Sequence, residues 1–417
     1  MPIHEHRFEQ GLTLLAEPLP GARTAAASLS VAAGASAEPE DACGMAAVLA
    51  EWCARGADGR DARALSDALD RFGADWTVDA GQTTAGVSML CLGEDLPQTL
   101  PLLLRVAVRP TLEDAAFGPS RDLQLQAVAG LADEPQRRCF IELREAYLPE
   151  PLNRPADGRA EDLAGLTPEA ARRWYRRQAR PGGAVLAVAG AFDWDTLVAS
   201  VGEAVHDWSG RSDWDAGRSA GHDLGARRLR GVRHVRQASS QTHIAVAYPG
   251  LPAEHGDLPL MASVLGVLSG GMSGRLFTEV REKRGLCYSV SASHRAGRFR
   301  GDVYAYAGTT TARAQETLDV LLGELDRVRE GVTADELDRA LVGMRSGLVM
   351  QGESTSARAS SIAGDWWTLG RARTLDQRRR ELDTVDLERV NAFLASRPAA
   401  EPAVVTLGEL PLTVPGG

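Results

Sequence analysis

The sequence contains an internal duplication, and this repeat limits the folds that the chain can adopt. In the first half, a strand-like stretch at 24–32 is followed by a helical stretch opening at Ala46 and by alternating residues up to Cys91. In the second half, the same order runs from 242–249 through a helix near Ala262 to alternating residues. Because strands and helices do not alternate strictly, the pattern predicts an α+β fold of two homologous domains. Each is expected to hold a mostly antiparallel sheet packed with helices, rather than half of one doubly wound sheet.

A change of composition separates the two halves. Residues 209–233 are rich in Gly, Ser, Asp and Arg and lack a sustained apolar period, which predicts a linker. The predicted domains are therefore an N-terminal domain over 1–208 and a C-terminal domain over 234–417. Both lengths fall within the usual range for a domain.

Charge and composition exclude several classes of function. Lys and Arg number 46 against 56 Asp and Glu, so the formal net charge is −10, which argues against nucleic-acid and membrane partners. No apolar run reaches the length of a membrane-spanning helix, and the first 20 residues lack the pattern of a secretory signal. The five cysteines are odd in number and scattered, which argues against a disulfide framework. We expect a cytoplasmic protein.

The common catalytic motifs are missing from the sequence. None of the eight histidines lies in H-E-x-x-H or H-x-x-E-H, the spacings that place two imidazoles on one helix face for zinc. There is no G-x-S-x-G elbow, no phosphate-binding G-x-x-x-x-G-K-[ST] loop and no G-x-G-x-x-G fingerprint. The residues therefore predict no autonomous catalytic machinery.

One glycine-rich loop leads into a short helix in the second half. The loop is Ser269–Gly274, and the predicted helix covers 275–283. Ser273 is placed to cap this helix by accepting an amide hydrogen bond. An ordinary loop entering a helix explains the same pattern.

The end of this helix carries an arginine and a tyrosine. Gly285 fits a left-handed helix end, and the reversal there would bring the Arg281 guanidinium near the Tyr288 hydroxyl. Such a pair can hold a carbonyl oxygen and stabilise charge that develops on it. Regular alternation, however, places Tyr288 on the same strand face as Leu286 and Val290, which favours a core aromatic.

The stretch S-G-G-M-S-G-R-L-F-T-E-V-R-E-K-R-G-L-C-Y-S-V-S-A-S closely resembles the second-domain signature of the pitrilysin-like zinc peptidases. These are inverzincins and include the mitochondrial processing peptidases. In that signature, an arginine and a tyrosine seven residues apart contact the substrate beside zinc, and Arg281 and Tyr288 match these positions. The resemblance covers nearly the whole chain, including 151–167 and Gly190. It implies the family's two-domain α+β fold.

The first half departs from the family where zinc would be bound. Active members carry G-x-A-H-x-x-E-H, and the matching segment here is G-M-A-A-V-L-A-E at 44–51. The first histidine is thus replaced by Ala47, the glutamate base by Ala50 and the second histidine by Glu51. The helix expected to hold the third ligand, 117–135, has Ala127 where the family has a glutamate. A catalytic zinc needs three protein ligands, so we expect no metal in this chain and a solvated Glu51.

The resemblance leaves two functions open. In the first, the chain is the non-zinc-binding subunit of a heterodimeric metallopeptidase and has no activity alone. A homologous partner with H-x-x-E-H then supplies zinc, this chain supplies Arg281 and Tyr288 in trans, and a short or unfolded peptide is hydrolysed. In the second, the chain is an inert scaffold or a peptide-binding protein. A scaffold has no need of both side chains, so their presence favours the catalytic partner.

Overall fold

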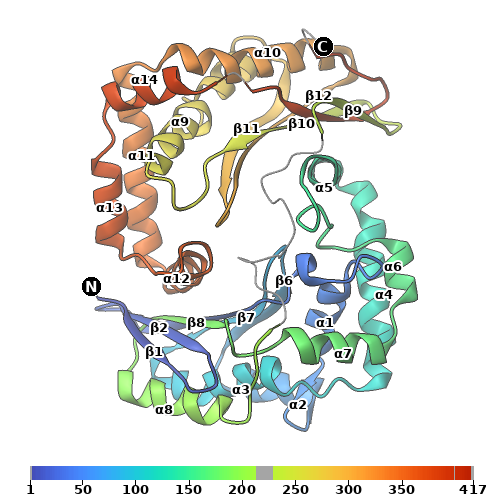
Figure 1. Cartoon of the computed structure of the whole chain (residues 1–417), viewed down its shortest axis with the longest axis vertical. Coiled ribbons are helices and arrows are strands. Elements are labelled where there is room, and N and C mark those ends of the chain that lie inside the picture. The colour runs from blue at the N-terminus through green and yellow to red at the C-terminus, as the bar shows by residue number, and fades with distance from the viewer. Residues whose placement is uncertain (1, 213–228, 399, 415–417) are drawn as a thin grey trace. The chain divides into compact units, whose positions relative to one another are not determined.

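The structure is a computed structural model that describes residues 2–212, 229–398 and 400–414. The chain divides into two compact units, each built around one sheet with helices (Figure 1). Unit 1 comprises residues 1–130, 150–222 and 351–375, and unit 2 comprises 131–149, 223–350 and 376–417. The units are therefore not two consecutive segments. Most of the predicted linker, 213–228, lies outside the described residues, and 231–233 belong to a strand.

Unit 1 holds a sheet of six strands in the described residues, with helices on its faces. Its strands are β1 (His4–Arg7), β2 (Thr13–Pro18), β3 (Thr24–Val31), β6 (Asp75–Ala80), β7 (Ala85–Leu92) and β8 (Val185–Gly190), beside a small pair, β4 (Gly56–Ala57) and β5 (Arg60–Asp61). Its helices are α1 (Met45–Cys53), α2 (Ala62–Asp70), α3 (Leu96–Val108), α4 (Asp114–Gly130), α6 (Ala160–Gly165), α7 (Pro168–Gln178), α8 (Trp194–Val205) and α12 (Thr355–Leu369).

Unit 2 holds a sheet of five strands in the same described part of the chain. Its strands are β9 (Gly231–Arg236), β10 (Gln241–Gly250), β11 (Cys287–Ala296), β12 (Gly301–Thr310) and β13 (Ala403–Gly408). Its helices are α5 (Pro135–Tyr147), α9 (Leu258–Ser269), the π-helix η4 (Phe277–Glu282), α10 (Ala314–Arg327), α11 (Ala334–Glu353), α13 (Leu375–Asp383) and α14 (Leu387–Ser396), with α11 and α13 crossing the unit boundary.

The two sheets share one topology, which confirms the predicted fold of two homologous α+β domains. Unit 1 has the order β1-β2-β8-β3-β7-β6, and unit 2 has β9-β13-β10-β12-β11 when read in the same direction. In each sheet the first shared pair, β2 with β8 or β9 with β13, is parallel, and the other pairs are antiparallel. Strand β1 is the one addition in unit 1. The sheets are thus mostly antiparallel, as the sequence predicts.

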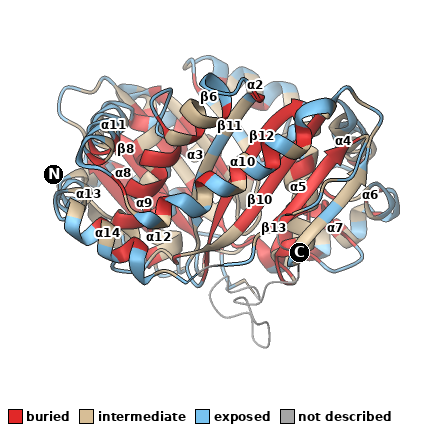
Figure 2. Cartoon of the chain, turned by 90° about the horizontal axis from the view of Figure 1, so that it is seen from above, coloured by how far each residue is buried: buried red, intermediate tan, exposed pale blue. Residues whose placement is uncertain are grey.

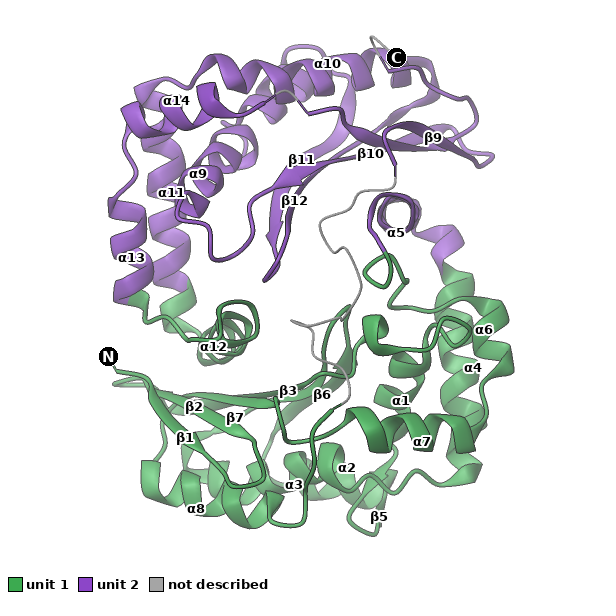
Figure 3. Ribbon diagram, in the orientation of Figure 1, with its two compact units in different colours: residues 1–130, 150–222, 351–375 green, residues 131–149, 223–350, 376–417 purple. Residues whose placement is uncertain are grey.

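Each unit contains one helix that the other half of the sequence provides. Helix α12 packs against β3 and β8 of unit 1, whereas α5 packs against β10 and β13 of unit 2 (Figure 3). Each exchanged helix is held by a buried polar contact. Arg358 of α12 pairs with Glu17 of β2, and the Tyr147 hydroxyl of α5 donates to Asp302 Oδ1 at 2.9 Å.

Burial is concentrated in the sheets and in the helix faces that cover them (Figure 2). Strands β8 and β13 are buried along their full length because each lies inside its sheet, and their sequences V-L-A-V-A-G and A-V-V-T-L-G are accordingly apolar. Local signals set the helix ends. Helix α7, for example, begins where Thr167 accepts a hydrogen bond from Ala170 N. In the described parts of the chain, no helix is long and apolar enough to cross a membrane.

Candidate functional site

The arginine and tyrosine lie on either side of a tight chain reversal in unit 2. The helix that carries Arg281 is π-helical over Phe277–Glu282, a form often found at functional sites. It ends at Gly285, which has a φ of +60° and so adopts the predicted left-handed conformation. Leu286 N then donates to Val280 O at 3.0 Å, which closes the reversal and starts β11.

Tyr288 lies in a β-bulge at the start of β11. Cys287 pairs with Thr309 and Ser289 pairs with Gly308, so Tyr288 has no partner residue on β12. A bulge turns the extra residue out of the regular alternation. The Tyr288 side chain is 84% exposed, whereas Leu286 is buried. The expectation of a core aromatic is therefore wrong.

The Arg281 guanidinium lies between two aromatic rings. Its Cζ atom is 4.8 Å from the centroid of the Phe277 ring and 5.7 Å from that of Tyr288. This stacking fixes the direction of the guanidinium and leaves its N–H donors at the surface. The neighbouring cations Lys283 and Arg284 both pair with Glu279. Arg281 has no acidic partner in the described part of the chain, so its donors remain available to a ligand.

The glycine-rich loop before the helix is fixed by an arginine that the sequence did not single out. Arg275 donates to both carboxylate oxygens of Glu336 on α11, at 2.6 and 2.8 Å, and to Gly331 O at 2.8 Å. The hydrogen bonds from Arg275 to the carboxylate are the main cause that lowers the pKa of Glu336 to about 2. No side chain caps the helix, so the cap expected from Ser273 is not formed. Arg275 positions the segment instead.

A cavity of about 980 Å³ lies beside Tyr288 within unit 2. It is lined by β11, β12 and the start of α5, and its wall includes Phe140, Tyr306 and the buried His243. His243 Nδ1 and the Tyr306 hydroxyl are 2.7 Å apart. Burial lowers the pKa of His243, which favours the neutral imidazole, and burial raises the pKa of Tyr306 to about 12. The place of His243 in this cavity could not be predicted from the sequence, because α5, which covers it, comes from the other half of the chain.

The positions that hold zinc in the resembling family form a second, smaller cavity in unit 1. Ala47, Ala50 and Glu51 of α1 line a space of about 240 Å³, together with Gln124 of α4. Ala127 is not among its lining residues; it lies about one turn further along α4 than Gln124. The structure thus brings together three of the four predicted positions. Helix periodicity, applied from an established facing residue, would have identified Gln124.

The side chains around this cavity are already engaged with the protein. Glu51 forms an ion pair with Arg55, just beyond the end of α1, and Gln124 Nε2 donates to Asp157 O at 2.8 Å. No three histidine, cysteine or carboxylate side chains of the described residues are grouped to hold a metal ion. Alanines, an ion-paired glutamate and an engaged amide do not fit a catalytic zinc, which needs three available ligands.

Helix α1 keeps its place although the family's ligands are replaced. The buried Glu38 carboxylate accepts hydrogen bonds from Gly44 N at 2.9 Å and Ala46 N at 2.7 Å. Burial outweighs these two bonds and raises the pKa of Glu38 to about 8. The start of α1 is therefore fixed from outside the helix, by a residue that a ligand search does not reveal.

Comparisons with known families match both halves of the chain. Residues 13–157 match the family described as insulinase, peptidase family M16, and residues 165–343 match the peptidase M16 inactive domain. An uncharacterized zinc protease of Mycobacterium tuberculosis is 29% identical, over 92% of this chain and 87% of that protein. One from Bacillus subtilis is 25% identical, over 94% of each chain.

Solved structures share the fold. A peptidase M16 inactive domain from Pseudomonas fluorescens superposes with a TM-score of 0.87 at 21% identity, covering 100% of both chains. A protease from Helicobacter pylori gives a TM-score of 0.85 at 16% identity, covering 97% of this chain and 99% of that one. At these identities the likeness concerns the fold alone.

Proposed function

The chain belongs to the pitrilysin-like peptidase family M16, and we propose that it is the non-zinc-binding subunit of a heterodimeric metallopeptidase. A homologous partner with an intact H-x-x-E-H motif supplies the zinc and the general base. This chain supplies Arg281 and Tyr288 in trans. The substrate is a peptide that is short or unfolded, because the two side chains act on backbone groups of an extended chain.

One observation carries the proposal. Arg281 and Tyr288 are held against each other at the surface by a π-helix, a left-handed glycine and a bulge. Their polar groups are not used inside the described part of the protein. An inert scaffold gains nothing from an exposed tyrosine in a bulge beside an unpaired guanidinium. The alanines at two of the zinc-site positions of the same chain support a partner as the source of the remaining chemistry.

The chemical roles follow from the two groups. The Arg281 guanidinium donates hydrogen bonds to a backbone carbonyl of the bound peptide and so fixes the register of the peptide. The Tyr288 hydroxyl donates to the scissile carbonyl oxygen, and this bond strengthens as the oxygen gains negative charge. The guanidinium is oriented before the peptide binds, since it stacks on the rings of Phe277 and Tyr288.

The location proposed for this complex is the cytoplasm. All five cysteines are free and buried in the structure. Unpaired thiols are typical of a reducing compartment.

The test is reconstitution with a homologue that carries H-x-x-E-H, followed by peptide cleavage assays. We expect activity only from the mixture. Arg281→Ala and Tyr288→Phe should each lower kcat by about 100- to 1,000-fold. Lys283→Ala is the matched control, because this cation lies at the end of the same helix and pairs with Glu279. If the complex forms and both variants retain full activity, the chain is a scaffold.

A further inference from the structure

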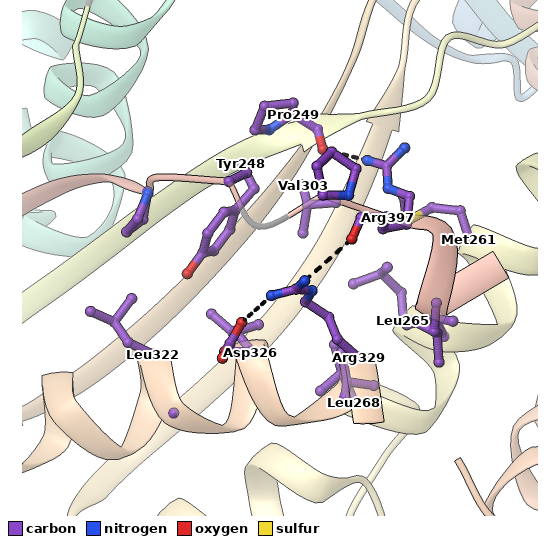
Figure 4. A pocket seen from close by; sticks show the side chains of 18 of the residues that line it. Tyr248, Pro249, Met261, Leu265, Leu268, Val303, Leu322, Asp326, Arg329 and Arg397 are labelled. Atoms are coloured by element: carbon purple, nitrogen blue, oxygen red, sulfur yellow. Dashed lines mark hydrogen bonds and ion pairs between the residues drawn. The ribbon is translucent and has the colours of Figure 1, made fainter. Parts of the chain in front are cut away.

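Unit 2 contains a second cavity, of about 440 Å³, which is lined mostly by apolar residues. It lies between α9, α10 and one end of the sheet (Figure 4). Leu265 and Leu268 of α9 lie on one side of it, and Tyr248 and Leu322 lie on the other. A space this large between core elements is unusual, because protein interiors are close-packed.

The polar groups at this cavity are largely satisfied by the protein. Arg329 Nη1 donates to Asp326 Oδ1 at 2.9 Å, and Nη2 donates to Arg397 O at 3.3 Å. Arg397 Nη2 in turn donates to Pro249 O at 3.0 Å. Figure 4 shows these contacts as a chain along one wall. The feature left without a partner is therefore the apolar surface.

Unit 1 shows what covers the helix that corresponds to α10. By topology, α3 corresponds to α10 and β8 corresponds to β13. After β8, helix α8 packs against α3 and buries Leu197, Val201 and Val205. Trp208 follows, 4% exposed, and its Nε1 donates to Ala179 O at 2.9 Å. One amphipathic helix, followed by one buried indole, thus covers α3 in unit 1.

In unit 2, no helix follows β13 within the described residues, which continue to Val414. The segment after β13 contacts the first turn of α10, where Thr413 N donates to Gln315 Oε1 at 2.9 Å, and its residue Val414 lines the cavity. In unit 1, Ser200 of α8 bonds to Pro97 at the corresponding turn of α3. Beyond that turn, Leu322 and Gly323 line the cavity. By comparison with unit 1, the element expected to cover α10 is therefore a helix.

The exposed face of α10 is acidic, which determines the charge expected of a helix that packs on it. Glu316 and Asp319 are exposed on α10 and pair with no cation among the described residues. Asp319 accepts one hydrogen bond, from Gln315 Nε2 at 2.8 Å. In unit 1, the same kind of contact is charge-matched, since Arg105 of α3 pairs with Asp207 at 2.7 Å. An acidic α10 calls for a basic partner.

We propose that this cavity receives a basic amphipathic helix of another polypeptide, which packs on α10 as α8 packs on α3. One large apolar side chain of that helix fills the space between α9 and α10. The interaction requires neither Arg281 nor Tyr288, so it is independent of the proposed peptidase role. Helix-in-groove recognition of this kind depends on a few apolar anchors.

The test uses the full chain and two synthetic helical peptides of about 18 residues. Both carry the apolar spacing of Leu197, Val201, Val205 and Trp208, one with lysine and the other with glutamate at the outward positions. Fluorescence anisotropy should show saturable binding of the lysine peptide, about tenfold tighter than the glutamate peptide, with a smaller difference in high salt. Replacing the peptide's tryptophan by alanine should weaken binding about tenfold.

Two matched variants test whether the peptide binds at this cavity. A Cβ at Gly323 meets no atom within 4 Å, so Gly323→Trp should fill the cavity mouth without strain and weaken peptide binding at least about tenfold. Gly343 on α11 is equally open and does not line the cavity, so Gly343→Trp should bind as the parent does. Asp319→Lys should reverse the preference between the peptides and does not depend on how a tryptophan packs. Failure of both peptides to bind, or unchanged binding by both cavity variants, overturns the proposal.

Discussion

Arg358 donates a hydrogen bond from Nε to Glu17 Oε2 at 2.6 Å, and both side chains are fully buried, although 341 positions separate them in the sequence. The pair joins the helix that enters unit 1 from the second half of the chain to a strand of the first half. A buried ion pair of this kind fixes position, because each charge is costly to bury without the other.

Breaking this pair should be strongly destabilising. Arg358→Met is expected to lower the free energy of unfolding by about 3–5 kcal/mol, since it leaves the Glu17 carboxylate buried and unpaired. Urea unfolding followed by circular dichroism measures the change. Adding Glu17→Leu should restore part of the loss. Arg63→Met is the control, because Arg63 and Asp67 pair at the exposed surface. A loss no larger than that of the control would show that other contacts hold α12.

The same experiment can be made on α5, the second exchanged helix, where a smaller loss of stability is expected. Tyr147→Phe removes the hydroxyl that donates to Asp302, and it should lower the free energy of unfolding by about 1–3 kcal/mol because a buried acceptor loses its partner. Tyr288→Phe removes the same atom from an exposed ring and should leave the free energy of unfolding unchanged. Equal effects from the two substitutions would contradict the role assigned to Tyr147.

The free energy of unfolding should fall in acid because the Glu336 carboxylate becomes protonated. Arg275 holds the pKa of this carboxyl at about 2, below the ordinary 4.5. The carboxylate therefore contributes stability above about pH 4.5, and this contribution is lost as the pH falls towards 2. Glu336→Gln should cost about 1 kcal/mol at neutral pH, since solvent screens part of the interaction. Urea unfolding at a series of pH values measures both quantities. A variant that keeps the parent's acid sensitivity between these pH values would refute the assignment.

The residues that line the cavity beside α1 indicate which substitutions should create a zinc site. A chain with Ala47→His, Ala50→Glu, Glu51→His and Gln124→Glu should bind about one zinc ion, because all four positions line one space. Replacing Gln124→Glu by Ala127→Glu in the same variant should bind zinc more weakly, since Ala127 lies outside the cavity lining. Metal analysis after dialysis distinguishes the two. Equal zinc content would mean that a carboxylate at either position of α4 reaches the metal.

The sequence predicted the repeated order of elements, and the matching strand order of the two sheets bears this out. Local patterns, such as the left-handed helix end at Gly285, can also be predicted from the sequence. The exchange of α5 and α12 was not, because it depends on contacts between segments far apart in the chain. Tyr288 was misplaced because alternation assumes a regular strand, and a single bulge changes the facing of the residue. The expected helix over 117–135 ends at Gly130 instead, and α5 begins at Pro135.

The exchanged helices have a consequence for how such a chain could have arisen. A polypeptide with one repeat alone would leave a sheet face uncovered and would carry a helix with no sheet of its own to cover. Two copies could satisfy each other by trading that helix, which is domain swapping. Fusion of the two copies makes the trade intramolecular and independent of protein concentration. The present chain therefore has the connectivity of a swapped homodimer joined into one gene product.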